Sequence, residues 1–364
     1  MNRSAFILAL FAALVLTNGL RAEERTLPAQ PGENLRIDMR SGGSVEVQGT
    51  EAGEVKVEWD AAGRSAENIQ VDVQRVEKGV RVASAGHSLN LRILVPRRFN
   101  LDLHTSGGNI KIADVEGKFD GQTMGGNIVL NRVKGGLSLS TRGGNISMAD
   151  SDMDGIVTTM GGSISLKNVA GNTKVSTMGG HVTLDNVVQR GGYSIDKVVE
   201  VSTMGGNISV ANAPRGANVS TQGGNVVIDK SSDRVEARTM GGNITLGEHG
   251  GQLIASTMGG DVKAVIVPGS SNQNIDISSM GGRIDLTLPA DFSGVFDLEI
   301  AYTRQSTKDY QIVSDFPVRQ QTTPEWDQRQ GNALKFIRGT GTAGGGANKV
   351  KIRTVNGNIL IKKK

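Results

Sequence analysis

Apolar and polar residues alternate in short segments along most of this chain, most regularly in residues 105–288. Within each segment the apolar residues are spaced by two, which is the spacing of a β-strand with one face turned inward. One such column consists of Ile110, Ile128, Ile146, Ile164, Val182, Ile208, Val226, Ile244, Val262 and Ile284. No segment of this region shows the apolar spacing of a helix, and glycine recurs too often for helix interiors. The pattern therefore predicts an all-β region.

The strand segments belong to a repeat with the motif T-x-G-G-N-I. Its first glycine falls at 107, 125, 143, 161, 179, 205, 223, 241, 259 and 281, so that all but two intervals are 18 residues. The longer intervals, of 26 and 22 residues, hold turn-rich insertions at 190–197 and 268–274. A fixed short period is typical of stacked repeats that bury their apolar faces against their neighbours. We expect a parallel β-solenoid (β-helix) of about ten 18-residue coils, with Ile128, Ile146 and Ile164 in one core column.

The Gly-Gly pair of the motif is expected to form a corner of each coil. Such a corner needs either a positive φ or a close approach between neighbouring coils. The threonine and asparagine columns of the motif are expected to form stacked ladders there. His181, Asp261 and Arg283 are among the residues that replace the asparagine. This replacement argues against a buried, obligatory hydrogen bond at that place.

The residue just before the glycine pair is most often methionine. Seven of the chain's eleven methionines stand there, and Arg142 and Gln222 take the same place in two copies. If the preceding threonine points inward, this residue points outward. A line of exposed, polarisable side chains is suited to binding, although it could also pack beneath a corner or shield a sheet edge. The predicted binding strip consists of Met124, Met160, Met178, Met204, Met240, Met258 and Met280.

Residues 1–22 have the pattern of a secretory signal, with Arg3 before an apolar core at 5–16. This apolar run is too short to cross a bilayer, so a membrane anchor is the weaker interpretation. We expect cleavage near Ala22 and export to the periplasm, the cell surface or the medium. The mature chain is expected to have no transmembrane span.

Composition excludes several kinds of site. The chain contains no cysteine, and therefore no disulfide, no lipid-attached cysteine and no thiolate metal site or nucleophile. Cleavage after residue 22 removes Arg3 and Arg21 and no acidic residue, which lowers the formal net charge from +4 to +2. A nearly balanced charge gives little support to nucleic-acid binding.

The chain divides into three regions after the signal. Residues 23–104 are expected to form an N-terminal β segment of irregular strands that continues into the solenoid. Residues 105–288 form the regular repeats. Residues 289–364 contain an aromatic-rich insertion followed by a C-terminal capping coil. Imperfect copies of the motif, RSGGSV at 40–45 and TVNGNI at 354–359, lie in the first and last regions.

Three passages carry a resemblance to a known family: the repeated T-x-G-G-N-I, the passage VP-x-x-x-x-L-x-L-x-T-S-G-G-N-I at 95–110, and GGG-x-x-K-V-K-I-R-T-V-N-G-N-I at 344–359. Over roughly residues 30–364, the chain resembles the bacterial β-strand-repeat family labelled as proposed adhesins, a domain of unknown function. The resemblance implies a secreted or envelope-associated β-solenoid without known catalytic residues. The aromatic insertion between Pro289 and Phe336 departs from the family pattern.

One short motif suggests a metal. Asp150, Asp152 and Asp154, followed by Gly155, match the start of a calcium-binding loop. The place of the bidentate glutamate is taken by Gly161, and no helices flank the motif. The alternative is an acidic turn between two strands. Calcium is the only cofactor that the sequence suggests.

Enzyme sites have little support in the sequence. Carbohydrate-active β-helices gather two or three carboxylates, or a base beside calcium, on one face. The acidic residues of the repeats are scattered over different columns or lie far apart, and they include Asp185, Asp229, Asp261 and Asp285. The histidines, His104 among them, show no recurring acidic partner or serine nucleophile. We therefore expect no catalytic residues.

Aromatic residues concentrate between residues 292 and 336. A bulky apolar segment can cap the open end of a solenoid, or it can stack on glycans or dock a partner. The candidate binding residues of this segment are Tyr302, Tyr310 and Trp326.

The sequence favours a non-enzymatic, exported adhesin-like binding or scaffold protein of the bacterial envelope, whose partner is a protein or glycan of the cell surface. A polysaccharide lyase or hydrolase, and an assembly module of an envelope-stress or secretion system, are the alternatives.

Overall fold

The computed structural model describes most of the chain, and every regular element in the described residues is a β-strand. The described residues are 23–61, 71–84, 88–188, 199–270, 272–306, 309–328 and 333–364. The predicted signal peptide at 1–22 and the insertion at 190–197 lie outside them. No helix in the described residues is long and apolar enough to cross a membrane. The predicted all-β class is confirmed.

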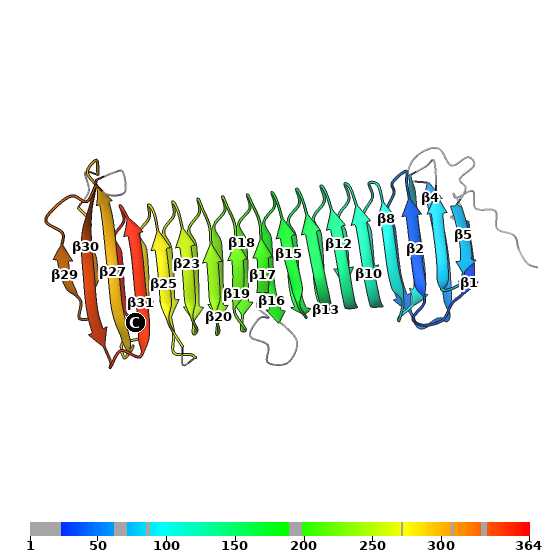
Figure 1. Cartoon of the computed structure of the whole chain (residues 1–364). Helices are drawn as coiled ribbons and strands as arrows, with labels where there is room; N and C mark the ends of the chain where they lie inside the picture. Colours follow the sequence, from blue (N-terminus) through cyan, green and yellow to red (C-terminus); the bar gives the residue numbers. More distant parts are fainter. Residues whose placement is uncertain are drawn as a thin grey trace, which may run out of the picture.

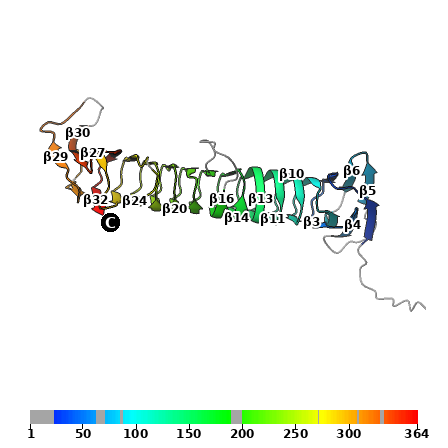
Figure 2. The ribbon, with the colours of Figure 1, turned by 90° about the horizontal axis from the view of Figure 1, so that it is seen from below.

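The strands form two long rows, A and B, and the chain crosses between the rows after most strands (Figures 1 and 2). In stacking order, row A contains β5 (Val71–Val76), β6 (Gly79–Ser84), β2 (Asn34–Met39), β8 (Asn100–Thr105), β10 (Glu116–Thr123), β12 (Lys134–Thr141), β15 (Thr173–Thr177), β17 (Val199–Ser202), β19 (Ala217–Ser220), β21 (Val235–Arg238), β23 (Leu253–Thr257), β25 (Ile275–Ser279), β31 (Asn348–Val355), β27 (Gly294–Thr303), β30 (Leu334–Ala343) and β29 (Arg319–Thr322).

Row B contains, in the same direction, β1 (Glu23–Pro28), β4 (Glu54–Ala61), β7 (Leu89–Pro96), β3 (Val45–Thr50), β9 (Ile110–Ala113), β11 (Ile128–Asn131), β14 (Ile164–Ala170), β16 (Val182–Val188), β18 (Ile208–Ala213), β20 (Val226–Ser231), β22 (Ile244–His249), β24 (Val262–Ile266), β26 (Ile284–Leu288), β32 (Ile359–Lys363) and β28 (Ile312–Ser314). The long strand β13 (Ile146–Thr159) contributes to both rows.

Strands one repeat apart are parallel and in register. Ile146 pairs with Ile128 of β11 and with Ile164 of β14, and all three are buried. Each inward aliphatic residue thus packs on its equivalents in both neighbouring repeats, and these columns join into one hydrophobic cluster between the rows. The predicted in-register stacking of these residues is confirmed, and the arrangement is compatible with the expected solenoid.

The N-terminal end of the stack does not follow chain order. The repeat formed by β2 and β3 lies between β6 and β7 on its outer side and β8 and β9 on its inner side. Beyond it the pairing becomes antiparallel, because β5 pairs with β6, β4 with β7, and β1 with β4. Antiparallel strands therefore terminate both rows at this end.

The C-terminal end is also rearranged. The last two strands of the chain, β31 and β32, fill a place between β25 and β26 on one side and β27 and β28 on the other. β30 and β29 then add antiparallel strands beyond β27. The final copy of the motif, at 354–359, therefore lies inside the stack, and the strands of the aromatic-rich segment form its end (Figure 1).

Candidate functional site

The Gly-Gly corner of each repeat is bonded to the preceding repeat through its threonine. Thr159 Oγ1 donates a hydrogen bond to the carbonyl oxygen of Gly144 (2.8 Å) and accepts one from the N–H of Gly162 (3.2 Å). The same two bonds recur at Thr123, Thr141, Thr177, Thr203, Thr221, Thr239 and Thr257. The threonines are buried, and each joins two successive glycine corners. The expected threonine ladder, which we call the threonine relay, therefore consists of hydroxyl groups that each bond to the glycine backbone of two successive corners.

The second glycine of each pair lies against the corner before it. A Cβ atom on any second glycine from Gly108 to Gly282 would lie 1.8–2.0 Å from the carbonyl oxygen of its counterpart. A Cβ on the first glycine would find its nearest neighbour at 3.5 Å or more. None of these glycines has a positive φ. Of the two expected reasons for the pair, close approach explains the second glycine.

The methionine column stands on the outside of this corner. Its seven side chains, which we call the methionine ridge, are between 41% and 61% exposed: Met124, Met160, Met178, Met204, Met240, Met258 and Met280. The backbones beneath them are directly bonded, because Met204 N donates to Met178 O and Met258 N donates to Met240 O, each at 3.1 Å. The outward direction predicted from the buried threonines is confirmed. Binding by the ridge stays a prediction.

A polar ladder follows the corner on its row B side. The N–H of Asn127 donates to Asn109 Oδ1 (2.8 Å), and each later copy repeats this bond to the repeat before it. Where asparagine is replaced, Ser163, His181 and Asp261 still offer an acceptor atom. His181 and Asp261, two of the replacements that seemed to argue against an obligatory bond, therefore preserve it on the surface of the molecule.

The three aspartates of the calcium motif are not gathered into a ligand set. All three lie in β13, which passes from row B to row A at the left-handed residue Asp150. Asp150 Oδ1 accepts a hydrogen bond from Asn168 Nδ2 (2.8 Å), and Asp154 Oδ1 accepts one from the N–H of Asn172 (2.6 Å). In the described residues no three His, Cys, Asp or Glu side chains are grouped to hold a metal. Calcium binding by Asp150, Asp152 and Asp154 stays a prediction without a formed site.

The left-handed backbone at Asp150 belongs to a column that sequence reasoning missed. Five residues spaced by 18 share a φ between 50° and 58°, and they are Asp114, Arg132, Asp150, Asn168 and Asn186. Aspartate and asparagine tolerate this conformation better than most residues, so their recurrence was the available signal. Arg132 binds both carboxylate oxygens of Asp114, at 2.6 and 2.7 Å, and this contact lowers the pKa of Asp114 to about 2.

The three candidate aromatic residues do lie together. The ring centroids of Tyr302 and Tyr310 are 6.0 Å apart, and Trp326 meets Tyr302 edge-on at 5.8 Å. Lys335 Nζ lies 5.4 Å from the centre of the Trp326 ring, a cation–π distance. All three aromatic side chains are half-buried, and Tyr302 contacts both of the others. This aromatic cluster therefore leaves part of its surface accessible, and whether it caps the stack or binds a partner stays a prediction.

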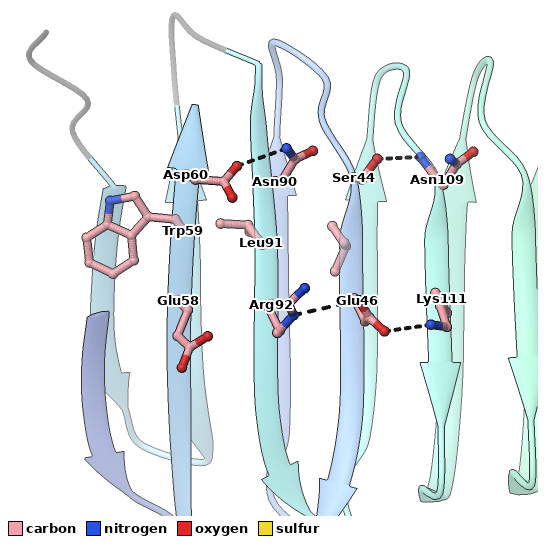
Figure 3. A pocket seen from close by; sticks show the side chains of 11 residues that line it. Ser44, Glu46, Glu58, Trp59, Asp60, Asn90, Leu91, Arg92, Asn109 and Lys111 are labelled. Carbon is pink, nitrogen blue, oxygen red and sulfur yellow. Dashed lines mark hydrogen bonds and ion pairs between the residues drawn. The ribbon is translucent and has the colours of Figure 1, made fainter. Parts of the chain in front are cut away.

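A polar pocket of about 360 Å³ opens on row B near the N-terminal end (Figure 3). Glu46 lies at its centre, with Lys111 Nζ at 2.7 Å and Arg92 Nε at 3.8 Å. The hydrogen bond from Lys111 lowers the pKa of Glu46. Above these three charged side chains in Figure 3, Asn90 Nδ2 donates a hydrogen bond to Asp60 Oδ1 (2.9 Å). The alternating charges of these N-terminal strands were the signal that sequence reasoning did not use.

A larger groove of about 980 Å³ lies on row A across β2, β8 and β10. Asp102 is central to it, with His104 Nδ1 at 2.9 Å and Arg36 Nε at 3.6 Å. Asp120 is the in-register neighbour of Asp102 on the next strand. The sequence argument considered only recurring acidic partners of the histidines, and it did not foresee this single pairing of His104 with Asp102. Residues two apart on a strand share a face, which brings Asp102 and His104 together.

Comparison with known proteins adds little to these observations. No protein-family model and no curated protein matches the chain. A solved structure from Clostridium sporogenes, described as that of a proposed cell adhesion protein, is similar at 9% sequence identity over 94% of this chain and 100% of that one, with a TM-score of 0.19. A likeness at that level carries no argument about fold or function.

Proposed function

We propose that this chain is an exported, non-enzymatic β-solenoid that acts as an adhesin-like binding or scaffold protein of the bacterial cell envelope. The methionine ridge is its binding surface, and a protein or glycan of the cell surface is its partner. The observation that carries this proposal is the exposure of all seven ridge methionines on a single column. Exposed apolar patches are a common feature of interaction sites.

The surroundings of the ridge support a binding role over a structural one. The corner is already held by the buried threonines and the closely packed second glycines. Arg142 and Gln222 occupy ridge positions in the same geometry, so the corner forms without methionine there. Flexible thioether side chains adapt to partners of varied shape. The methionines are therefore available for contact with another molecule.

The test replaces Met178, Met240 and Met258 together with glutamine. We expect the variant to fold, because surface substitutions usually change stability by about 0.5 kcal/mol or less each. Attachment of the purified chain to bacterial cells or envelope extract should fall. A matched control replaces Val129, Ile156 and Val313, which are also exposed but lie off the ridge, with glutamine. Equal attachment by both variants and the wild type would refute the role of the ridge.

One observation favours an enzyme as the second candidate. Asp102 and Asp120 are paired in register in the groove on row A, with His104 beside Asp102. Two carboxylates on one face are the minimum that glycoside hydrolysis requires. Cleavage of a bacterial polysaccharide by the wild type, lost in Asp120→Asn and retained in Asp185→Asn, would support a carbohydrate-active enzyme. Asp185 is a matched control because it lies on β16, away from the groove.

The aromatic cluster favours the third candidate, an assembly module of an envelope-stress or secretion system. Its partly exposed rings at the end of row A are suited to docking against another protein. An envelope protein that copurifies with the wild type and is lost in Trp326→Ala would support an assembly module.

A further inference from the structure

The methionine ridge is divided into runs by the residues that replace methionine. Met160, Met178 and Met204 occupy three consecutive repeats, and Met240, Met258 and Met280 occupy another three. Arg142 precedes the first run and Gln222 separates the two. Met124 stands alone, because Ser106 and Arg142 hold the ridge position on either side of it.

The apolar residues of the ridge are all methionine. From Ser106 to Met280 the column contains no leucine, isoleucine, valine or phenylalanine, although the inward columns of the same repeats are mostly built of isoleucine, valine and leucine. A surface selected only for hydrophobicity would use these aliphatic residues as well. The apolar members of the column from Ser106 to Met280 therefore share the thioether group, and the first aliphatic member is Val355, beyond Met280.

We propose that the run of Met240, Met258 and Met280 binds a soft monovalent metal ion, copper(I). Thioether sulfur is a soft ligand that selects copper(I) over the hard cations, which prefer oxygen. The chain has no cysteine to compete for the ion. In the described residues no group of three His, Cys, Asp or Glu side chains offers an alternative site. The inference goes beyond the proposed function and does not depend on it.

The geometry of the stack suits such a site. Met258 N donates to Met240 O (3.1 Å) and Met280 N donates to Thr257 O (3.2 Å), so the three residues leave the backbone from adjacent repeats. Adjacent strands are about 4.8 Å apart. The three rotatable bonds of each methionine let sulfur atoms from adjacent repeats converge on one ion. All three side chains are exposed, so an ion can reach them from solvent.

The two runs differ in their charged neighbours. The second run is bounded in the column by Gln222 and by Val355, which follows Thr354, the partner of Ser279. The first run adjoins Arg142, whose carbonyl oxygen accepts a hydrogen bond from Gly161 N (2.8 Å). A guanidinium at that position repels a cation, whereas Arg238 and Arg283, the arginines beside the second run, are paired with Glu236 (2.5 Å) and Asp285 (2.7 Å). We therefore expect the second run to bind copper(I) more tightly than the first.

The experiment measures copper(I) transfer to the full mature chain from a coloured copper(I) chelator, under anaerobic conditions with ascorbate. Replacement of Met240, Met258 and Met280 together with leucine preserves the apolar side chains and removes the sulfur. We expect affinity to fall by about 100-fold or more, since even changes to groups that only orient metal ligands cost about 10- to 100-fold. Met124→Leu, a single isolated methionine, is the matched control and should bind as the wild type does.

Several results would overturn the proposal. They are a wild-type chain that takes no copper(I) from the chelator, a leucine triple variant that binds as tightly as the wild type, and X-ray absorption of the loaded wild type that shows nitrogen or oxygen neighbours in place of sulfur. The absorption measurement decides the question even if the triple variant does not fold. Copper(I) transfer is measured without cells and attachment to cells without copper(I), so failure of the metal site and failure of the binding role are distinguishable.

Discussion

At the scale of single residues, the two glycines of a corner are under different constraints. The second glycine lies so close to the preceding corner that no side chain fits, whereas the first has room for a methyl group. Glycine is required at the second position by contact between repeats, and not by its own backbone angle.

We expect Gly162→Ala to destabilise the protein much more than Gly161→Ala. The added Cβ of residue 162 would lie 1.9 Å from the Gly144 carbonyl oxygen, whereas that of residue 161 finds its nearest atom at 3.6 Å. Overpacking typically costs about 1–3 kcal/mol, and a displaced backbone costs more. Denaturant unfolding of both variants measures the difference. Similar stability of the two variants would show that the repeats can move apart at the corner.

A buried histidine makes stability depend on pH. His249 is 0% exposed at the end of β22, between Ser231 and Ile266 on the neighbouring strands. Burial lowers its pKa below the ordinary value of 6.5, opposed by the backbone of Gln252 and Gly251 and by the charge of Asp233. The unfolded chain therefore binds a proton more readily than the folded chain. His249 contributes stability above about pH 6.5 that is lost as the pH falls.

We expect His249→Ile to reduce the loss of unfolding free energy between pH 7 and pH 5. Isoleucine suits the site because Ile266 occupies the same column on the next strand. Between pH 7 and pH 9 the stability curves of the wild type and the variant should run parallel, which serves as the internal control. An unchanged slope below pH 7 would show that His249 is protonated without cost in the folded state.

At the scale of elements, each corner is specified by hydrogen bonds that reach the repeat before it. The threonine relay lies inside the corner and the asparagine ladder lies on its surface. Both connect backbone groups that strand pairing leaves unpaired. Such groups are costly when they are buried without a partner.

We expect Thr159→Val to cost about 1–3 kcal/mol of unfolding free energy, because it leaves the Gly144 carbonyl and the Gly162 N–H without their side-chain partner. The matched control is Thr158→Val, the same change on the adjacent residue, which faces outward and is only half-buried. It should cost little. Thermal or denaturant unfolding compares the stability of the two variants. Equal stabilities would show that the threonine hydrogen bonds do not stabilise the corner.

At the scale of the whole molecule, the two ends of the stack are closed by rearranged strands. β31 and β32 fill an internal place, and their residues Val350, Ile352, Ile359 and Ile361 are buried. Without them, β25 to β28 would each lose a neighbouring strand. Unpaired edges of this kind readily pair with other chains.

We expect a chain that ends at Ala343 to melt at a lower temperature and to self-associate. Addition of a synthetic peptide of residues 344–364 should restore the monomer, because the vacated place matches it. The same peptide with Ile352→Asp and Ile361→Asp is the control and should fail, since it would bury unpaired charges. Size-exclusion chromatography with light scattering measures the outcome. A truncated chain that stays monomeric and melts as the wild type would contradict this account.

Prediction from the sequence succeeded for the features that recur in every repeat. The columns of Ile146 and Thr159 and the outward direction of Met160 follow from strand alternation and the period of 18 alone. Prediction missed the pair Asp102 and His104, since it searched for recurring partners and this pair occurs once. It left open whether the three aspartates of β13 gather into a calcium site, and in the described residues they form no ligand set.

The sequence by itself determined the strand period, the in-register pairing and the faces of the side chains, because every repeat meets the same neighbours at the same spacing. Only the tertiary structure decided that β2 and β3 lie inside β6 and β7, and that β31 and β32 enter between β25 and β27. These pairings join segments far apart in the chain, and no period links them. They depend on which exposed edge and which apolar face remain to be covered once the regular repeats have stacked.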